Sequence, residues 1–208
     1  MRLFFAVDLP ADLTRGFANL QAEFEAAEGL SFTDPDQAHA TMKFIGDINE
    51  DAEGEAGDTR LDDVKLAGAA AVDAYKGGHQ AEPDNEADGE VATGPFEMEV
   101  GGLGVFPSPD YISVLWTGVR DGAAELTRLH YALEAETTEL GFDPEDHAFT
   151  PHFTLARMND PRGKELIQDR LGEYDPTVGR FEVTELKLKR STLGSEGAEH
   201  ETIARYPL

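Results

Sequence analysis

The stretch His39-Ala40-Thr41-Met42-Lys43-Phe44 has an echo at His152-Phe153-Thr154-Leu155-Ala156-Arg157. Both copies contain His-x-Thr, and both lie in runs typical of β-strands. Successive side chains of a strand point to opposite faces, so the histidine and the threonine of each copy share one face. Each copy therefore presents an imidazole and a hydroxyl on one side of a strand, while the other side can pack into a core.

The two motifs together indicate a catalytic site. His39 and Thr41 from one strand, and His152 and Thr154 from the other, would surround a small anion if both strands faced a common cleft. A free imidazole has a pKa of about 6.5, so one histidine can be neutral and the other charged near neutral pH. The neutral one can take a proton from water, the charged one can protonate a leaving oxygen, and the hydroxyls can donate to a phosphate ester. The residues alone leave open which histidine is the acid.

Two basic residues next to the motifs are candidates for substrate binding. Strict alternation puts Lys43 on the His39 face, where it could contact phosphate, with a solvated strand lysine as the alternative. The same rule puts Arg157 on the face opposite His152, so a β-bulge or a turn would be needed to bring it to the site.

The segments around the motifs repeat in the same order. Each half reads strand, helix, His-x-Thr strand, helix, strand, beginning at Leu3 in the first half and at Tyr111 in the second. This order predicts an α+β fold with two pseudo-symmetric lobes, each an antiparallel sheet with helices packed outside, and an active-site cleft between them. We expect residues 1–208 to form a single bilobal domain whose lobes are built from about 1–105 and 106–208.

Three stretches interrupt this regular order. Residues 79–94 are acidic and lack periodicity, which predicts an exposed insertion or a lid. Residues 101–107 are rich in glycine and are expected to form a loop that connects the lobes. Residues 181–189 alternate apolar and polar side chains with one slip in phase, as in a strand with a bulge.

The charge of the chain is strongly negative. There are 17 Lys and Arg against 42 Asp and Glu, a net charge of −25. Such a surface stays hydrated in concentrated salt, where screening removes the self-repulsion, and it predicts a halophile with a saline cytoplasm. An acidic protein that avoids nucleic acid or binds a basic partner is the alternative. Basic residues gather only in one stretch, which is a candidate RNA path or else a solvated strand face: Arg180, Lys187, Lys189 and Arg190.

Several classes of protein are excluded or disfavoured. The absence of cysteine excludes a thiol nucleophile, a thiolate metal site and disulfide bonds. The sequence contains no familiar metal-binding motif, so we expect neither a metal nor a cofactor. The opening apolar run ends at Asp8, too short for a signal peptide, and no stretch is long enough to span a membrane. A cytoplasmic monomer is the expectation.

The remaining histidines have simpler interpretations. His130 lies at the edge of an apolar helix stripe and reads as structural. His147 precedes the second motif and could reach the cleft, although a solvated loop position is the simpler interpretation. His79 and His200 are expected to be exposed.

The motifs and their flanks resemble a known family. The flanks are Phe4-Phe5-Ala6-Val7-Asp8-Leu9-Pro10, Leu103-Gly104-Val105-Phe106-Pro107, Leu115-Trp116, the Pro151 before the second motif and the ending Tyr206-Pro207-Leu208. With the two ordered motifs, they resemble the RNA 2',3'-cyclic phosphodiesterases, once called 2'-5' RNA ligases, of the two-histidine (2H) phosphoesterase superfamily. Met42 stands where the family more often has leucine, a swap that roughly conserves volume.

The resemblance implies a role for each motif. His39 would be the proton donor and His152 the proton acceptor in hydrolysis of a terminal 2',3'-cyclic phosphate to a 2'-phosphomonoester. The partner would be an RNA 3' terminus or a small cyclic nucleotide. Two alternatives stay open at this point: the reverse reaction, which joins RNA ends through a 2'-5' bond, and a non-catalytic module that binds RNA ends or nucleotides.

Overall fold

The computed structural model describes residues 1–48, 61–78, 93–194 and 197–208. Most of the insertion expected at 79–94, and His79 with it, lies outside the described residues. The elements within them are β1 (Arg2–Asp8), α1 (Thr14–Ala22), β2 (Leu30–Phe32), β3 (His39–Asp47), α2 (Leu61–Lys76), β4 (Phe96–Ser108), β5 (Tyr111–Val119), α3 (Ala123–Glu139), β6 (His152–Met158), α4 (Lys164–Glu173), β7 (Thr177–Val183), β8 (Glu185–Gly194) and β9 (Gly197–Pro207), with short 3-10 turns η1 (Pro35–Gln37) and η2 (Pro161–Gly163).

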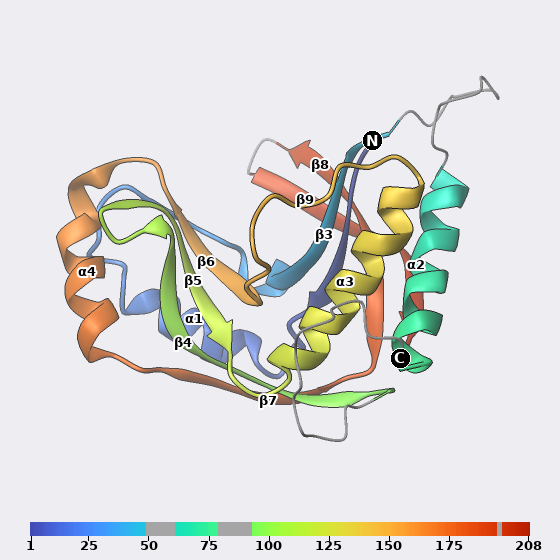
Figure 1. The fold of residues 1–208 in the computed structure, drawn as a ribbon. Coiled ribbons are helices and arrows are strands. Elements are labelled where there is room, and N and C mark those ends of the chain that lie inside the picture. Colours follow the sequence, from blue (N-terminus) through green and yellow to red (C-terminus); the bar gives the residue numbers. More distant parts are fainter. Residues whose placement is uncertain (49–60, 79–92, 195–196) are drawn as a thin grey trace.

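All strands join one antiparallel sheet that has two halves. The order is β7-β4-β5-β6-β3-β1-β8-β9, with β2 added to β6. The halves meet where Ala40 of β3 pairs with Phe153 of β6, the central residues of the two motifs. Helices α2 and α3 lie outside the β3-β1-β8-β9 half, and α1 and α4 lie outside the other (Figure 1). The expected α+β class, with antiparallel strands and helices outside, is confirmed.

The two lobes are interleaved along the chain. Strands β8 and β9 come last in sequence but extend the lobe of β1, whereas β4 pairs with β5 and β7 in the other lobe. Helix α3 follows β5 but packs against β3, and α1 follows β1 but packs against β6 and β7. A boundary near residue 105 therefore does not separate the lobes as expected, because each half of the sequence contributes strands and a helix to the other lobe.

The phase slip in residues 181–189 has a different cause from the one expected. Val183 ends β7 opposite Phe96, and Leu186 lies in β8 opposite Tyr206, on the other lobe. The stretch is therefore two strands rather than one bulged strand. The chain crosses between lobes at Thr184, and the apolar residues on either side belong to different sheet halves.

The glycine-rich stretch 101–107 is strand rather than the expected loop. Residues of this stretch pair with β5, with a shift in register between Gly101 and Gly104. Gly104 lies opposite Trp116, and a Cβ on Gly104 would come within 2.0 Å of the indole ring. The glycine thus makes room for the ring of the one tryptophan in the sequence.

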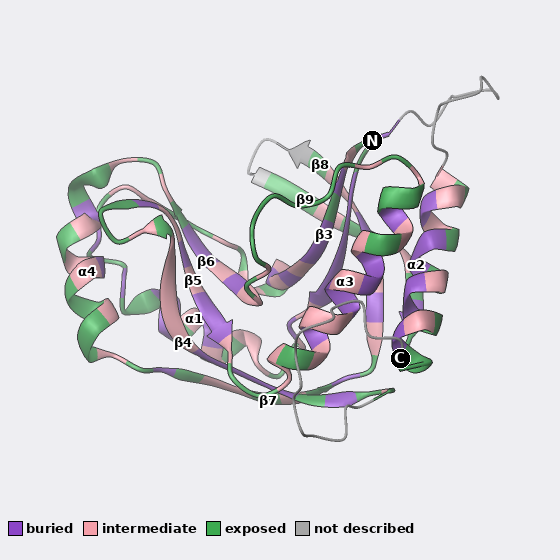
Figure 2. Ribbon diagram, in the orientation of Figure 1, coloured by how far each residue is buried: buried purple, intermediate pink, exposed green. Residues whose placement is uncertain are grey.

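The buried faces of the helices follow the apolar spacing in the sequence. Phe17, Leu20, Phe24 and Ala27 are buried under the sheet, and Leu13 packs at their edge. Helices α2 and α3 likewise turn their buried sides toward the strands and toward each other (Figure 2). No helix among the described residues combines the length and apolarity that crossing a membrane requires.

Candidate active site

A β-bulge directly follows each His-x-Thr motif. In β3, Ala6 pairs with Thr41 and Phe5 pairs with Lys43, so Met42 is an extra residue. In β6, Trp116 pairs with Thr154 and Leu115 with Ala156, so Leu155 is the extra residue. The bulges occupy the same position in the two motifs, directly after the threonine, and each reverses the alternation of side chains beyond it.

The two histidines are held in the same way. Nδ1 of His39 donates to the carbonyl oxygen of Gln37 at 2.8 Å, and Nδ1 of His152 donates to that of Thr150 at 2.7 Å. A carbonyl can only accept, so Nδ1 carries the hydrogen in both rings and Nε2 is left to exchange a proton. The same backbone contact, two residues earlier in the chain, thus selects the same tautomer twice.

The histidines and threonines come together at the junction of the lobes. Because β3 and β6 are antiparallel at the Ala40–Phe153 pair, His39 lies toward Thr154 and Thr41 toward His152. We call this side of β3 and β6 the motif face. All four side chains on it are half-buried, while Ala40 and Phe153 beneath them are buried. The structure therefore brings the four predicted catalytic residues together on one face.

A polar cluster from β1, β8 and β9 surrounds His39. Its ring lies 4.9 Å from that of Phe4 and 5.1 Å from that of His200, centroid to centroid. Asp8 is the register partner of His39, and it accepts from Lys187 at 3.1 Å and from Lys189 at 2.6 Å. Alternation along β1 could have revealed Asp8, since Phe4 and Asp8 share the motif face, but the contribution of β8 and β9 depends on the crossover between lobes.

Burial and nearby cations make His39 hard to protonate. Burial lowers the pKa of His39 to about 4, and the hydrogen bond to Gln37 opposes this effect. The charges of His200 and Lys189 lower the pKa further, while that of Asp8 raises it. Asp8 itself has a lowered pKa, because the two lysines outweigh the effect of its burial. In the absence of an anion, His39 is therefore neutral at pH 7.

An aromatic cluster surrounds His152 instead. Its ring lies 4.9 Å from Phe106 and 5.9 Å from Trp116. Burial lowers the pKa of His152, the hydrogen bond to Thr150 opposes this effect, and the positive charge of Arg157 lowers the pKa further. The pseudo-symmetry thus stops at the motif strands, because the register position of Asp8 beside His39 is taken by Gly118 beside His152.

Lys43 does not share the His39 face, so the expected geometry is wrong there. The bulge at Met42 turns Lys43 to the helix side, where it is 1% exposed and pairs with Glu134 at 2.6 Å. Nζ of Lys43 also donates to the carbonyl of Asp143 at 2.8 Å. Strict alternation fails because Met42 is an extra residue between Thr41 and Lys43. The Lys43 side chain is engaged in an internal ion pair.

The second bulge has the opposite consequence for Arg157. It restores Arg157 to the side of Thr154, where the residue is exposed and its charge reaches His152. The equivalent position in β3 is Phe44, which is 58% exposed and 6.1 Å from Phe4, ring to ring. Simple alternation could not place Arg157 and Phe44 on the motif face, because the sequence of neither motif predicts its bulge.

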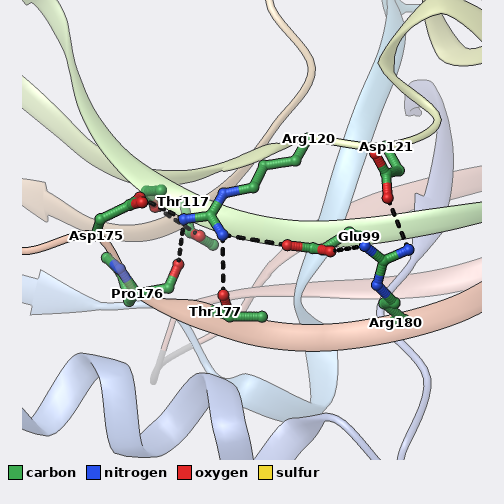
Figure 3. A network of polar contacts seen from close by, with 9 residues as sticks. Glu99, Thr117, Arg120, Asp121, Asp175, Pro176, Thr177 and Arg180 are labelled. Carbon is green, nitrogen blue, oxygen red and sulfur yellow. Dashed lines mark hydrogen bonds and ion pairs between the residues drawn. The ribbon is translucent and has the colours of Figure 1, made fainter.

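The basic stretch of the sequence is split between the lobes. Arg180 in β7 pairs with Glu99 and, at 2.7 Å, with Asp121, in a network that also holds Arg120 (Figure 3). Lys187 and Lys189 point to the cluster around His39, and Arg190 pairs with Glu201 at 2.5 Å. The four residues therefore do not line one path, and two of them belong to the candidate site.

One of the other histidines differs from its expected surroundings, and one agrees with them. His200 is part of the cluster around His39 rather than solvated. His147 is exposed, as its loop position suggested. Among the described residues, no three or more His, Asp or Glu side chains gather in a way that could hold a metal ion.

Comparison with known proteins identifies the family of the chain. Residues 18–194 match the family model described as the 2'-5' RNA ligase superfamily. An RNA 2',3'-cyclic phosphodiesterase of Methanothermobacter thermautotrophicus is 32% identical over 95% of this chain and 93% of its own. One from Aeropyrum pernix is 33% identical over 79% of this chain and 78% of its own.

Solved structures share the fold over the whole chain. TT0787 of Thermus thermophilus superposes with a TM-score of 0.73 at 24% identity, covering 100% of this chain and 98% of that one. The LigT of E. coli complexed with NADP+ gives a TM-score of 0.66 at 22% identity, covering 100% and 96%. Because the family model matches most of this chain, the chain belongs to the 2'-5' RNA ligase superfamily, alongside the RNA 2',3'-cyclic phosphodiesterases.

Proposed function

We propose that the protein hydrolyses a terminal 2',3'-cyclic phosphate of RNA to a 2'-phosphomonoester. The observation that carries the proposal is the matched pair of histidines on the motif face, each with Nδ1 bonded to a carbonyl and Nε2 left for proton transfer. The relatives named RNA 2',3'-cyclic phosphodiesterase support the choice of substrate.

The reaction divides its proton transfers between the two imidazoles. His152, neutral, takes a proton from water at Nε2 as the water oxygen bonds to phosphorus. The bond from phosphorus to O3' breaks, and protonated His39 gives its proton to O3'. Thr41 and Thr154 donate to the non-bridging oxygens, which gain charge in the transition state. The two histidines exchange their protons with solvent before the next turnover.

Substrate binding favours the protonated form of His39, which the reaction requires. An acid must be protonated, and burial, which lowers the pKa of His39 to about 4, leaves its imidazole neutral near pH 7. A bound phosphate is an anion, which favours the charged imidazole beside it and raises its pKa. Protonation of His39 would therefore accompany binding, while Arg157, on the side of His152, helps to hold the substrate.

A turnover assay in molar KCl tests the proposal. A short RNA ending in a 2',3'-cyclic phosphate is offered to the wild type, His39→Ala and His152→Ala, with and without EDTA. We expect a 2'-phosphate product from the wild type that EDTA does not suppress, and a loss of at least 100-fold in each variant, since general acid–base catalysis typically contributes about 10²–10⁴-fold. A folded wild type that produces nothing contradicts the proposal.

The alternatives give different results with the same protein. End joining would yield a 2'-5' linked product from two RNA halves, by the same histidines in exchanged roles. A binding module would hold the cyclic end without turnover, and both alanine variants would still bind. A small cyclic nucleotide in place of RNA is tested by its kcat/KM relative to the RNA.

The net charge of −25 bears on how the protein would bind RNA and on the salt concentration at which it would work. A strongly acidic protein repels RNA at low salt, and contacts that depend on counterion release weaken at high salt. We therefore propose that it recognises the RNA terminus through few phosphate contacts, as a monomer in a saline cytoplasm. Activity that rises from 0.1 M to 2 M KCl would support this setting, and activity greatest at low salt would contradict it.

A further inference from the structure

Each bulge leaves the backbone carbonyl of its extra residue outside the register pairs with β1 or β5, although the Leu155 carbonyl also accepts from the amide of Thr33, just beyond β2, at 2.9 Å. Met42 is 1% exposed and Leu155 is 0% exposed, so both carbonyls lie away from water. An extra residue interrupts the ladder, and a buried polar group without a partner costs stability. The bulges therefore persist only where another part of the protein supplies donors.

A buried side chain from a helix binds each of these carbonyls. Nδ1 of His130 in α3 donates to the Met42 carbonyl at 2.7 Å, and Nε2 of Gln21 in α1 donates to the Leu155 carbonyl at 2.9 Å. His130 is 2% exposed and Gln21 7%. The two helices follow equivalent strands in the repeat and each packs on the other lobe, so His130 and Gln21 correspond under the pseudo-twofold relation.

Each of these side chains also holds the segment that leads into the other motif. His130 stacks on Phe149, with centroids 4.2 Å apart and planes 6° from parallel, and Phe149 precedes the Thr150 whose carbonyl orients His152. Gln21 also donates to the carbonyl of Thr33 at 2.7 Å, in the segment that leads to Gln37 and His39.

We propose that His130 and Gln21 are paired positioning residues, each of which fixes the bulge of one motif strand and so determines which side chains face the substrate. Without the Met42 bulge, Lys43 rather than Phe44 would follow Thr41 onto the motif face. Without the Leu155 bulge, Arg157 would leave it, because a shift of one residue reverses a strand. The inference rests on the proposed function, since the residues being positioned are those assigned to the reaction.

Kinetics of matched variants test the positioning role. His130→Phe keeps the stack on Phe149 but removes the donor, and His130→Asn restores a donor near the Nδ1 position. Gln21→Met removes the side-chain donor to the Leu155 carbonyl and leaves only the amide of Thr33. Thr137→Val is the control, because its buried hydroxyl bonds only to carbonyls within α3. We expect kcat to fall about 10- to 100-fold in His130→Phe and Gln21→Met, since misplacement by about 1 Å can cost 100-fold. His130→Asn should recover most of the loss, and Thr137→Val should stay within about twofold of the wild type.

Double-mutant cycles separate positioning from general loss of stability. Each bulge variant is combined with Thr41→Val and with Thr154→Val. We expect His130→Phe, which keeps the stack on Phe149, to be non-additive with Thr41→Val and additive with Thr154→Val. Gln21→Met should be strongly non-additive with Thr154→Val and more weakly with Thr41→Val, because it also loses the hydrogen bond to Thr33. Additivity in all four cycles, or unchanged kcat in folded His130→Phe and Gln21→Met, would overturn the inference.

Backbone NMR keeps the test independent of the proposed substrate. His130→Phe should shift the amides of Thr41 and Lys43 most, and Gln21→Met those of Thr154 and Ala156. If the wild type turns over no cyclic phosphate, the proposed function fails while these shifts still decide whether the two side chains fix the bulges. Shifts that spread evenly over the sheet would count against the inference.

Discussion

The rings of His39 and His200 meet edge to face, with centroids 5.1 Å apart and planes 87° to each other. Lys189 lies close enough that its charge lowers the pKa of both imidazoles, and Asp8 is the counter-charge that raises both. Burial is the largest cause of the lowered pKa in each ring. The protonation of His39 and His200 at this end of the motif face therefore depends on the charges of Lys189 and Asp8. A bound phosphate would add a further negative charge beside them.

Removing the Lys189 charge should make His39 easier to protonate. Lys189→Gln takes away a cation that lowers the pKa of His39, so the pKa of His39 in the ligand-free protein should rise above its wild-type value of about 4. NMR titration of the imidazole measures the change. Lys65→Gln, on an exposed part of α2, is the control and should leave the titration unchanged. A pKa of His39 that falls in Lys189→Gln would show that the lysine acts mainly through Asp8.

The stability of the fold should depend on pH through His39. Its pKa is about 4 in the folded state against an ordinary 6.5, so the unfolded state binds more protons between these values. The contribution of neutral, buried His39 to the free energy of unfolding is present above pH 6.5 and is lost as the pH falls toward 4. From pH 7 to pH 5 it amounts to about 2 kcal/mol, at about 1.4 kcal/mol per pKa unit.

His39→Asn isolates this contribution, because asparagine can keep the donor to the Gln37 carbonyl but does not titrate. In 2 M KCl, urea unfolding at pH 7 and pH 5 should show a smaller loss of unfolding free energy for His39→Asn than for the wild type. The same loss in both proteins would mean that the folded-state pKa of His39 is close to that of the unfolded chain.

Periodicity and the repeated motif were sufficient to predict the class of fold and the four residues that meet on the motif face. His39, Thr41, His152 and Thr154 lie before the bulges, so simple alternation holds for them. The positions of Lys43 and Arg157 depend on the bulges beyond, and these rely on donors from Gln21 and His130 in helices far along the chain. Local patterns do not contain such contacts.

The interleaving of the lobes could not be predicted from the sequence for a related reason. Two lobes with the same element order can each be built from one contiguous half of the chain, or the halves can exchange strands and helices. Both arrangements give the same local sequence patterns. The choice is made by long-range packing, such as Leu186 and Leu188 reaching the core of the first lobe. This exchange also brings Lys187 and Lys189 beside Asp8.

Lys43 should matter for stability rather than for substrate affinity. Lys43→Met leaves the Glu134 carboxylate, which also accepts from the amide of Glu145 at 3.2 Å, without its cation. We expect a loss of about 3 kcal/mol in unfolding free energy, as for other buried pairs that lose one partner. The KM for the cyclic phosphate should stay within about twofold. A tenfold rise in KM with unchanged stability would instead place Lys43 on the substrate.

Combining Lys43→Met with Glu134→Leu should restore much of the lost stability, because the unpaired carboxylate is removed as well. Urea unfolding of the two single variants and the double variant gives the coupling between the residues. A double variant as unstable as the sum of the singles would show that the pair is not the source of the loss.

Gly104→Ala should disturb His152 through the indole ring of Trp116. The added methyl would lie 2.0 Å from Cζ2 and 2.1 Å from Cη2 of Trp116, so the ring must move, and it lies 5.9 Å from the ring of His152. We expect a loss of about 1–3 kcal/mol in unfolding free energy from overpacking, a shift in the fluorescence of the single tryptophan and a lower kcat. Gly172→Ala in α4, where the new methyl meets nothing within 4 Å, is the control. If kcat is unchanged in Gly104→Ala while the fluorescence shifts, the aromatic cluster supports the fold of that lobe without setting the orientation of His152.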